Sequence, residues 1–377
     1  MASRSEPTPL ALILAERIRS NGPITFAEYM EACLYHPVYG YYTKAEQQPG
    51  RDYFTSADAR PLFGRLLARQ LQEMWCVLGR PDTFQLVEAG AGTGRLAGQI
   101  LDFAAEAWPD FYQALRFIAV ERSTARRSLQ TKVLDGHIAR GKFLSQDELP
   151  DEVACGCIFS NELIDAMPVH RLVREGNDLR EIYVGLGRNG LCDEMGLLSS
   201  SELGEYLSEQ NIQLHQKQQA EANLAACRWI EQAGKMLQRG FIVTIDYGHE
   251  AQELYDERHM RGTLLAYERH RAGEDWFRAP GEQDLTAHVN FSALDLCGRR
   301  SGLVQTGFIS QSKFLLALAR HGNFSDLQSD EMAEVEQTQR RLLFKTLINP
   351  EGMGETFQVL IQHKGIEAGN LAGLQPL

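Results

Sequence analysis

The stretch FQLVEAGAGTGRLAGQILDFA, residues 84 to 104, decides the fold of this chain. A short apolar run leads into glycines at positions 90, 92 and 94, and a segment with a helical pattern follows them. Glycine allows the backbone to turn tightly and to approach a ligand closely. The first N–H groups of the following helix are free to bind polar groups. The stretch therefore predicts a strand, a ligand-binding turn and a helix.

Six further runs predict strands of the same sheet. They lie at residues 116 to 123, 142 to 150, 155 to 165, 240 to 250, 303 to 314 and 356 to 364. Helical patterns separate the first five strands, and such alternation is typical of a parallel sheet with helices on both faces. The sequence therefore predicts an α/β fold with a seven-stranded, mostly parallel sheet.

The remaining segments predict additions to this sheet. We expect an N-terminal helical extension (residues 1 to 80), an insert (171 to 238) and a second insert or lid (251 to 300), with the sheet divided among residues 81 to 170, 239 to 250 and 301 to 377. Thr25 and Glu28 have the spacing of a capping box at the start of a helix. The first insert predicts a hairpin that turns at residues 188 to 190, followed by a long polar helix.

Length and charge limit the classes of function. The 377 residues allow one large domain with insertions or two domains. The formal net charge of −12 argues against binding of duplex nucleic acid, which needs a basic surface, and permits a basic protein partner. The longest apolar stretches are far shorter than the roughly 20 residues of a membrane helix. Because the N-terminus has no apolar signal core and carries Glu6 and Glu16, we expect a cytoplasmic protein.

The seven cysteines do not predict a disulfide framework or a metal site. They are scattered and odd in number. Cys155 and Cys157 are two residues apart on a predicted strand and therefore share one face. No further ligands follow at the spacing of a metal site. We expect both side chains to pack in the core, and we expect no metal.

The glycine turn differs from the dinucleotide-binding pattern. That pattern requires a small residue at the position of Arg95. Glu88, at the end of the preceding strand, suits a ligand that carries an ammonium group better than it suits a pyrophosphate. Both residues disfavour a nicotinamide-dependent oxidoreductase.

An acidic residue followed by Gly-x-Gly-x-Gly resembles motif I of the class I S-adenosylmethionine-dependent methyltransferases, whose sheet is Rossmann-like. The resemblance implies that Glu88, Gly90, Gly92 and Gly94 hold the methionyl part of the cofactor. It also implies that Glu121, at the end of the second strand, accepts both ribose hydroxyls. Asp147, after the third strand, stands where a side chain commonly reads the adenine amino group, although SQDEL could equally cap a helix.

Polar residues gather at the end of the fourth strand, which the resemblance places beside the methyl donor. Asn161, Glu162 and Asp165 lie within five positions. Paired carboxylates suit a guanidinium acceptor, which is always charged and fork-shaped. Glu162 and Asp165 share a face if a helical turn begins there. The alternative is that Asp165 caps a turn and Glu162 is solvated.

Motifs along nearly the whole chain resemble the MidA-like methyltransferases of bacteria and mitochondria. They are GPITFAEYMEACLYHPVYGYY, DYFTSADARPLFG, LVEAGAGTGRL, AVERS, NELIDAMPVHR, TIDYG, DLTAHVNFSAL and MGETFQVLIQHK. The resemblance implies a class I methyltransferase with an N-terminal helical extension and an inserted lobe. For the mitochondrial member it implies symmetric dimethylation of an arginine on a respiratory complex I subunit, as an assembly factor.

The same resemblance adds two candidate residues. Thr55 is implied in cofactor binding, although Ala57 and Asp58 stand where the family usually has Pro-Glu. His288 is a candidate base or a wall of the acceptor pocket, and the alternative is a structural histidine. Ala91 replaces the proline that the family usually has in the glycine loop.

We therefore expect transfer of a methyl group from S-adenosyl-L-methionine to an arginine of a protein partner, with S-adenosyl-L-homocysteine as product. Glu162 and Asp165 would hold the guanidinium, and Asn161 would orient it. The alternatives are a cofactor-binding assembly module with little or no turnover and a methyltransferase for a small molecule. A homodimer is compatible with the sequence.

Overall fold

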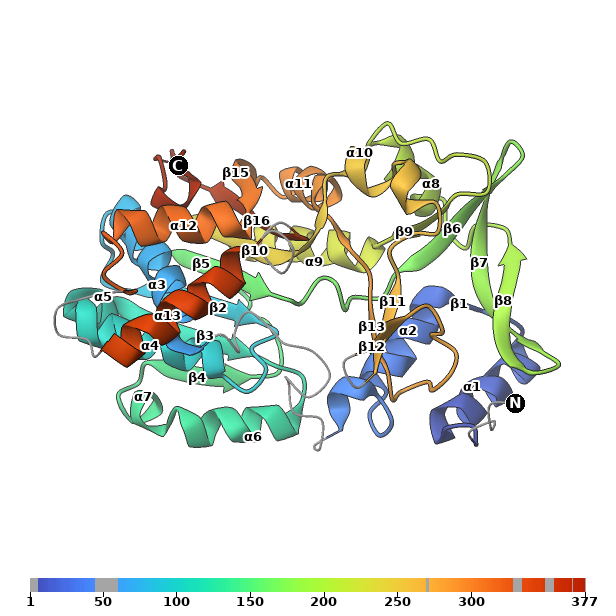
Figure 1. Cartoon of the computed structure of the whole chain (residues 1–377), viewed down its shortest axis with the longest axis horizontal. Helices are drawn as coiled ribbons and strands as arrows, with labels where there is room; N and C mark the ends of the chain where they lie inside the picture. Colours follow the sequence, from blue (N-terminus) through green and yellow to red (C-terminus); the bar gives the residue numbers. More distant parts are fainter. Residues whose placement is uncertain are drawn as a thin grey trace. The chain divides into compact units, whose positions relative to one another are not determined.

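The computed structural model describes residues 6–44, 60–268, 271–327, 334–349, 356–367 and 369–376 (Figure 1). The chain divides into two compact units, and each is described by itself. Unit 1 comprises Met1–Tyr53, Ile164–Trp229 and His249–Leu294. Unit 2 comprises Phe54–Leu163, Ile230–Gly248 and Asp295–Leu377.

Unit 2 contains the predicted sheet. Its strands are β2 (Phe84–Ala89), β3 (Leu115–Val120), β4 (Phe143–Gln146), β5 (Gly156–Asn161), β10 (Gly240–His249), β15 (Val304–Ser310) and β16 (Phe357–Lys364). They are hydrogen-bonded in the order β15-β16-β10-β5-β2-β3-β4. The five strands from β10 to β4 are parallel, and β16 runs antiparallel to both of its neighbours. The predicted mostly parallel arrangement is confirmed, but β14 (Val289–Asn290) also pairs with β10, so the sheet has eight strands among the described residues and not the predicted seven.

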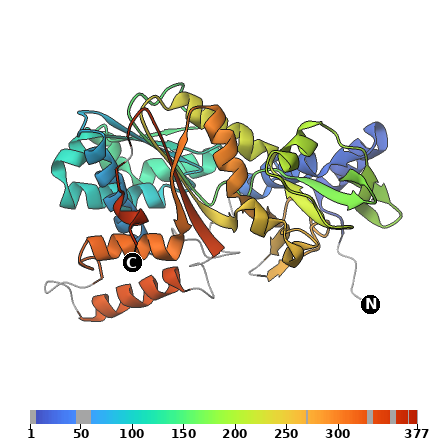
Figure 2. The ribbon, with the colours of Figure 1, turned by 90° about the horizontal axis from the view of Figure 1, so that it is seen from above.

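Helices cover both faces of this sheet (Figure 2). They are α3 (Arg60–Val77), α4 (Arg95–Ala107), α5 (Pro109–Ala114), α6 (Thr124–Val133), α7 (Asp135–Ala139), α12 (Gln311–His321), α13 (Glu334–Ile348) and η5 (Ala372–Leu374), with the C-terminal parts of α9 (Leu224–Met236) and α11 (Phe291–Arg300). Ile361 of β16 lies in one core with buried residues of α3, α4 and α12. The next residue, Gln362, donates a hydrogen bond to Asp295 of α11. Because successive strand side chains point to opposite faces, these helices lie on opposite sides of the sheet.

Helix α3 belongs to unit 2, whereas the sequence-based division places it in the N-terminal extension. Leu66, Leu67 and Leu71 are fully buried in the core of unit 2. The helical spacing of these residues fixes which face of α3 is apolar, but not which core receives it. The six segments expected from the sequence are thus grouped into two bodies.

Unit 1 combines the N-terminal segment with parts of both inserts. Its elements are α1 (Pro9–Asn21), β1 (Ile24–Thr25), α2 (Phe26–Tyr35), η1 (Tyr41–Thr43), β6 (His170–Glu175), β7 (Asp178–Gly187), β8 (Gly190–Gly196), α8 (Glu202–Ser208), β9 (Gln219–Ala222), α10 (Ala251–Leu254), η3 (Glu257–His259), β11 (Leu265–Glu268), β12 (Arg271–Gly273), β13 (Asp284–Thr286) and β14 (Val289–Asn290). One sheet has the order β1-β7-β6-β9, with β8 also paired to β7, and a second has the order β12-β11-β13. Leu10, Phe26, Val184 and Leu285 share one core. Segments far apart in sequence therefore fold together.

Two local predictions for unit 1 are confirmed and one is wrong. Thr25 and Glu28 form a reciprocal capping box at the start of α2, and β7 and β8 form the predicted hairpin. The long polar helix expected after this hairpin is absent. The chain instead forms α8, then β9 and then α9. Ala220 pairs with Leu172 of β6, so hydrogen bonding to a distant strand overrides the local helical preference.

The expectation that Cys155 and Cys157 pack in the core is confirmed. Cys157 is fully buried, and Cys155 packs partly buried against the core of unit 2. All seven cysteines are free thiols. Within the described ranges, no group of three or more His, Cys, Asp or Glu residues could hold a metal ion. No helix in the same ranges is long and apolar enough to cross a membrane.

Candidate functional site

The glycine turn after β2 is built from three residues in the left-handed region. Gly90, Gly92 and Gly94 have φ values of 74°, 53° and 79°. The backbone N–H groups of Gly90 and Ala91 both donate to the carbonyl oxygen of Val120, at 2.9 and 3.0 Å. The turn is thereby fixed to the end of β3, and α4 begins at the next residue, Arg95.

The three glycines meet different surroundings. A Cβ atom on Gly90 would lie 2.9 Å from the Leu163 side chain, and one on Gly94 would lie 3.0 Å from Cγ of Gln130. A Cβ atom on Gly92 would meet no atom within 4 Å. Gly90 and Gly94 therefore allow close packing inside unit 2, whereas the Cβ direction of Gly92 faces open space.

Glu88 is a buried carboxyl group at the end of β2. It is 4% exposed, and its Oε2 atom has no hydrogen-bond partner among the described residues. Burial, followed by the nearby charge of Glu121, raises the pKa of Glu88 to about 8. A buried carboxyl group with an unused oxygen is chemically suited to a ligand that brings an ammonium group.

Glu121 follows β3 and binds backbone groups of the turn. One carboxylate oxygen accepts the N–H of Gly92 at 3.0 Å, and the other accepts the N–H of Ser123 at 2.8 Å. Each carboxylate oxygen has two acceptor positions, so capacity for ligand hydroxyls remains. Its binding of ribose stays a prediction.

Gln130 of α6 was missed by the sequence analysis. It is fully buried, and its amide nitrogen donates to the carbonyl oxygen of Gly92 at 2.7 Å. Its amide oxygen accepts from the hydroxyl of Ser145 at 2.5 Å. Nothing local in the sequence marks Gln130, because its partners lie 38 and 15 residues away.

Asp147, another predicted cofactor residue, is exposed. The side chain of Asp147 follows β4, is 66% exposed and lies 3.6 Å from Arg127 as an ion pair. Its contact with adenine stays a prediction. Thr55 lies outside the described residues.

Asn161 and Glu162 form a corner at the end of β5. The amide nitrogen of Asn161 donates to a carboxylate oxygen of Glu162 at 3.1 Å. Glu162 has a φ of 53°, which is left-handed, so the helical turn on which a shared face of Glu162 and Asp165 depends does not begin there. Its backbone N–H donates to Ile245 of β10, and the N–H of Leu163 donates to buried Asp246. Pairing with the neighbouring strand thus determines this conformation.

Asp165 and His288 belong to unit 1, whereas Asn161 and Glu162 belong to unit 2. The N–H of Ala287 donates to the carbonyl oxygen of Asp165 at 3.0 Å, so the two predicted residues of unit 1 lie on neighbouring segments. Asp165 is 5% exposed. Burial, then the charge of Asp165, raises the pKa of the Tyr267 hydroxyl, which places these groups near each other.

His288 lies in a cluster of three histidines. Its ring centre is 5.5 Å from that of His249 and 6.4 Å from that of His259. Burial, then the charges of these two histidines, lower the pKa of His288 to about 4. The ring is therefore neutral near pH 7, and a pKa this low makes it a weak proton acceptor at that pH.

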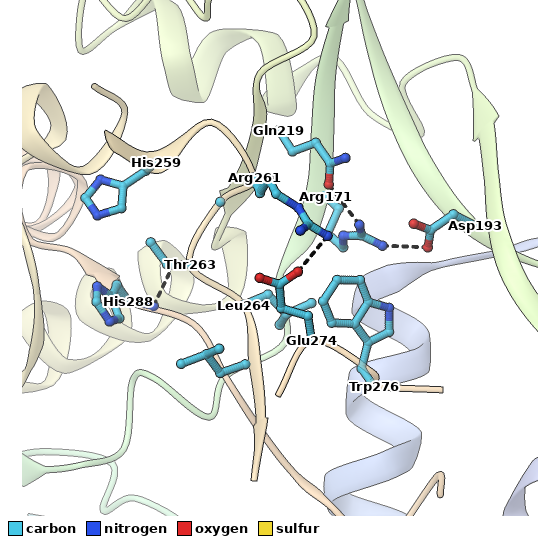
Figure 3. A pocket seen from close by; sticks show the side chains of 12 residues that line it. Arg171, Asp193, Gln219, His259, Arg261, Thr263, Leu264, Glu274, Trp276 and His288 are labelled. Carbon is cyan, nitrogen blue, oxygen red and sulfur yellow. Dashed lines mark hydrogen bonds and ion pairs between the residues drawn. The ribbon is translucent and has the colours of Figure 1, made fainter. Parts of the chain in front are cut away.

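Unit 1 also contains a cavity of about 330 Å³ (Figure 3). Arg171 lies on one side with Asp193 and Gln219, Arg261 points toward Glu274, and His288 lines the opposite side. The two arginines form ion pairs with these carboxylates at 2.6 Å in each case. The charges of the cavity are thus balanced internally, and they do not identify a ligand.

The residues of unit 2 fit a zwitterionic nucleoside ligand. Glu88 can receive its ammonium group, open space borders Gly92, and Glu121 can accept hydroxyl groups. The N-terminus of the 13-residue helix α4 follows directly and can receive the carboxylate of the ligand. These four features suit the ammonium, hydroxyl and carboxylate groups of S-adenosyl-L-methionine.

Known proteins are similar to this chain over nearly its whole length. A family model described as "Putative S-adenosyl-L-methionine-dependent methyltransferase" matches residues 66–309. A crystal structure from Burkholderia thailandensis, solved with bound S-adenosyl-homocysteine, has 30% sequence identity and a TM-score of 0.86. The match covers 98% of this chain and 97% of that one.

Curated relatives match at lower identity. The protein arginine methyltransferase NDUFAF7 of Danio rerio mitochondria is 28% identical over 92% of this chain and 84% of that protein. The mitochondrial protein of the same name from Homo sapiens is 27% identical over 96% of this chain and 85% of its own length.

Proposed function

Because the chain belongs to the family of S-adenosyl-L-methionine-dependent methyltransferases, we propose that it methylates a guanidinium nitrogen of an arginine in a partner protein. The family fixes the reaction class and the cofactor. The acceptor class is the step that we add. It is supported by the relatives that are named protein arginine methyltransferases and by the corner at the end of β5.

The corner of Asn161 and Glu162 carries this proposal. The Oδ1 atom of Asn161 is buried without a hydrogen-bond partner among the described residues, and the Glu162 carboxylate stands beside the same side chain. A guanidinium has five N–H donors and no acceptor, so a carboxylate next to an unused amide oxygen matches it. A left-handed glutamate costs on the order of 1 kcal/mol, and such strained residues cluster at functional sites.

The reaction needs positioning more than covalent chemistry. The cofactor supplies an electrophilic methyl group; transfer forms an N–C bond, breaks the C–S bond and releases one proton from the guanidinium. Glu162 would orient the guanidinium, and Asn161 would accept one of its N–H groups, so that one nitrogen is aligned for attack. Asp165 as a second carboxylate and His288 as proton acceptor remain proposals of the same kind.

Partners and location also remain proposals. The family resemblance implies a respiratory complex I subunit as acceptor, and a homodimer is compatible with the chain. We expect a cytoplasmic protein, whereas the curated relatives are named mitochondrial. Fractionation of the source cells with an antibody to the chain tests the location directly.

The test of the proposed function is transfer of a labelled methyl group. Extract from source cells that lack this gene is incubated with labelled S-adenosyl-L-methionine and the purified full-length chain. Labelled proteins are hydrolysed to identify the modified amino acid and mapped by mass spectrometry. Glu162→Gln is compared with Glu152→Gln, which changes an exposed glutamate of the same unit. Cofactor binding is measured for each protein by calorimetry.

We expect label on arginine with the wild type and with Glu152→Gln. Glu162→Gln should bind the cofactor normally and lose most of the transfer. Label on a small molecule or on another amino acid would refute the acceptor class. Normal binding with no label in any fraction would favour an assembly module with little or no turnover.

A further inference from the structure

The peptide groups of Gly92 are held from both directions by buried side chains. Its N–H donates to Glu121 at 3.0 Å, and its carbonyl oxygen accepts from Gln130 at 2.7 Å. We propose that Gln130 is a positioning residue that fixes the Gly92 carbonyl and thereby sets the affinity for S-adenosyl-L-methionine. The inference rests on the glycine turn as the cofactor site and does not depend on the identity of the acceptor.

The orientation of the Gln130 amide is determined by two different partners. Its oxygen faces the hydroxyl of Ser145 on β4, which donates at 2.5 Å, and its nitrogen faces the Gly92 carbonyl. A side chain at this position must therefore accept on one side and donate on the other. Glutamine does both without carrying a charge, whereas an ionised glutamate could only accept.

Packing shows on which side of the turn Gln130 acts. A Cβ atom on Gly94 would lie 3.0 Å from Cγ and 3.4 Å from Cβ of Gln130, so the stem of Gln130 lies directly against Gly94. The direction of a Cβ atom on Gly92 is open. Gln130 thus supports the packed side of the turn, while the open side remains for the ligand. It acts through the turn and needs no contact with the ligand.

Loss of these hydrogen bonds should weaken the affinity for the cofactor. Gln130→Leu keeps a buried side chain of similar volume but removes both hydrogen bonds, so the Gly92 carbonyl is no longer fixed. Loss of the hydrogen bond that fixes the Gly92 carbonyl should weaken the affinity roughly tenfold. Because the reacting groups are not touched, KM for the cofactor should rise while kcat changes little.

A second variant, Gln130→Glu, removes the amide donor and adds a negative charge. Gln130→Glu is nearly isosteric, and its ionised carboxylate would face the Gly92 carbonyl oxygen with no proton to donate. A protonated carboxyl group could donate to this oxygen and still accept from Ser145. The affinity of Gln130→Glu relative to wild type should therefore recover as the pH falls.

The experiment measures binding of S-adenosyl-homocysteine to the full chain by calorimetry from pH 5.5 to 8.5. Wild type, Gln130→Leu, Gln130→Glu and Thr131→Ala are compared, and the melting temperature of each is recorded. Thr131 lies on the same helix and is exposed, so its variant controls for changes to α6. Kinetics with a labelled cofactor give KM and kcat separately.

We expect a roughly tenfold weaker affinity for Gln130→Leu, an affinity of Gln130→Glu that approaches wild type at low pH, and no change for Thr131→Ala. Unchanged affinity of Gln130→Leu with a lower melting temperature would show that Gln130 is only structural. The proposal would also be overturned if the affinity of Gln130→Glu for S-adenosyl-homocysteine, divided by that of the wild type, did not vary with pH. Absence of binding by the wild type would refute the cofactor site itself, separately from any result on arginine methylation.

Discussion

Replacement of Glu88 by glutamine should change both the pH dependence of stability and the affinity for the cofactor. The folded pKa of Glu88 is about 8 and its ordinary value is 4.5, so the folded protein holds this proton more tightly than the unfolded chain does. The contribution of Glu88 to the free energy of unfolding is therefore fully present below about pH 4.5, and it is lost as the pH rises toward 8. The difference of 8 − 4.5 = 3.5 pKa units corresponds to on the order of 5 kcal/mol.

The variant Glu88→Gln cannot ionise and should escape this loss. Its free energy of unfolding should exceed that of the wild type by several kcal/mol at pH 8.5, and the difference should shrink toward pH 5. Denaturant unfolding of the cofactor-free chain across this range measures the difference. Glu152→Gln, which alters an exposed carboxylate, should follow the wild type throughout.

Binding of S-adenosyl-homocysteine should release the proton that Glu88 carries in the free protein. At pH 7, one unit below the pKa, about nine-tenths of the Glu88 carboxyl groups are protonated in the free protein. An ammonium group placed beside Glu88 favours the ionised form, so binding of S-adenosyl-homocysteine should release close to one proton. Calorimetry in buffers of different ionisation enthalpy counts it. No proton release, together with wild-type affinity of Glu88→Gln, would refute the assignment of Glu88 to the ligand ammonium.

Three further variants test other parts of the structure. Gly92→Val should abolish cofactor binding in calorimetry while leaving circular dichroism unchanged, because its side chain would enter the open space beside a residue with φ 53°; unchanged affinity would remove Gly92 from the site. Asp165→Ala should bind the cofactor and lose methyl transfer, and loss of cofactor binding would instead indicate a structural role. His288 has a folded pKa of about 4 against an ordinary 6.5, so its contribution to stability is lost as the pH falls through this window, by on the order of 3 kcal/mol. His288→Gln should be less sensitive to acid than the wild type in thermal melts from pH 7 to 4.5, and equal sensitivity would contradict the buried neutral ring.

The sequence by itself determined the elements that depend on local chemistry. The strand before Gly90, the left-handed glycines and the capping box of Thr25 and Glu28 follow from residue types within a few positions of one another. Apolar periodicity and the conformational freedom of glycine act over this distance. The mostly parallel arrangement of the sheet follows from the alternation of such elements along the chain.

Only the tertiary structure decided which distant segments share a core. It also decided the backbone conformation, the hydrogen bonds and the pKa values of the site residues. Residues 6–44 fold with parts of both inserts, α3 packs on the sheet, and Glu162 is left-handed because β10 holds its backbone. Gln130 reaches Gly92 across 38 residues, and the pKa of Glu88 rises because the surrounding core excludes water. Burial and long-range hydrogen bonding depend on every element at once, so no local stretch of sequence contains them.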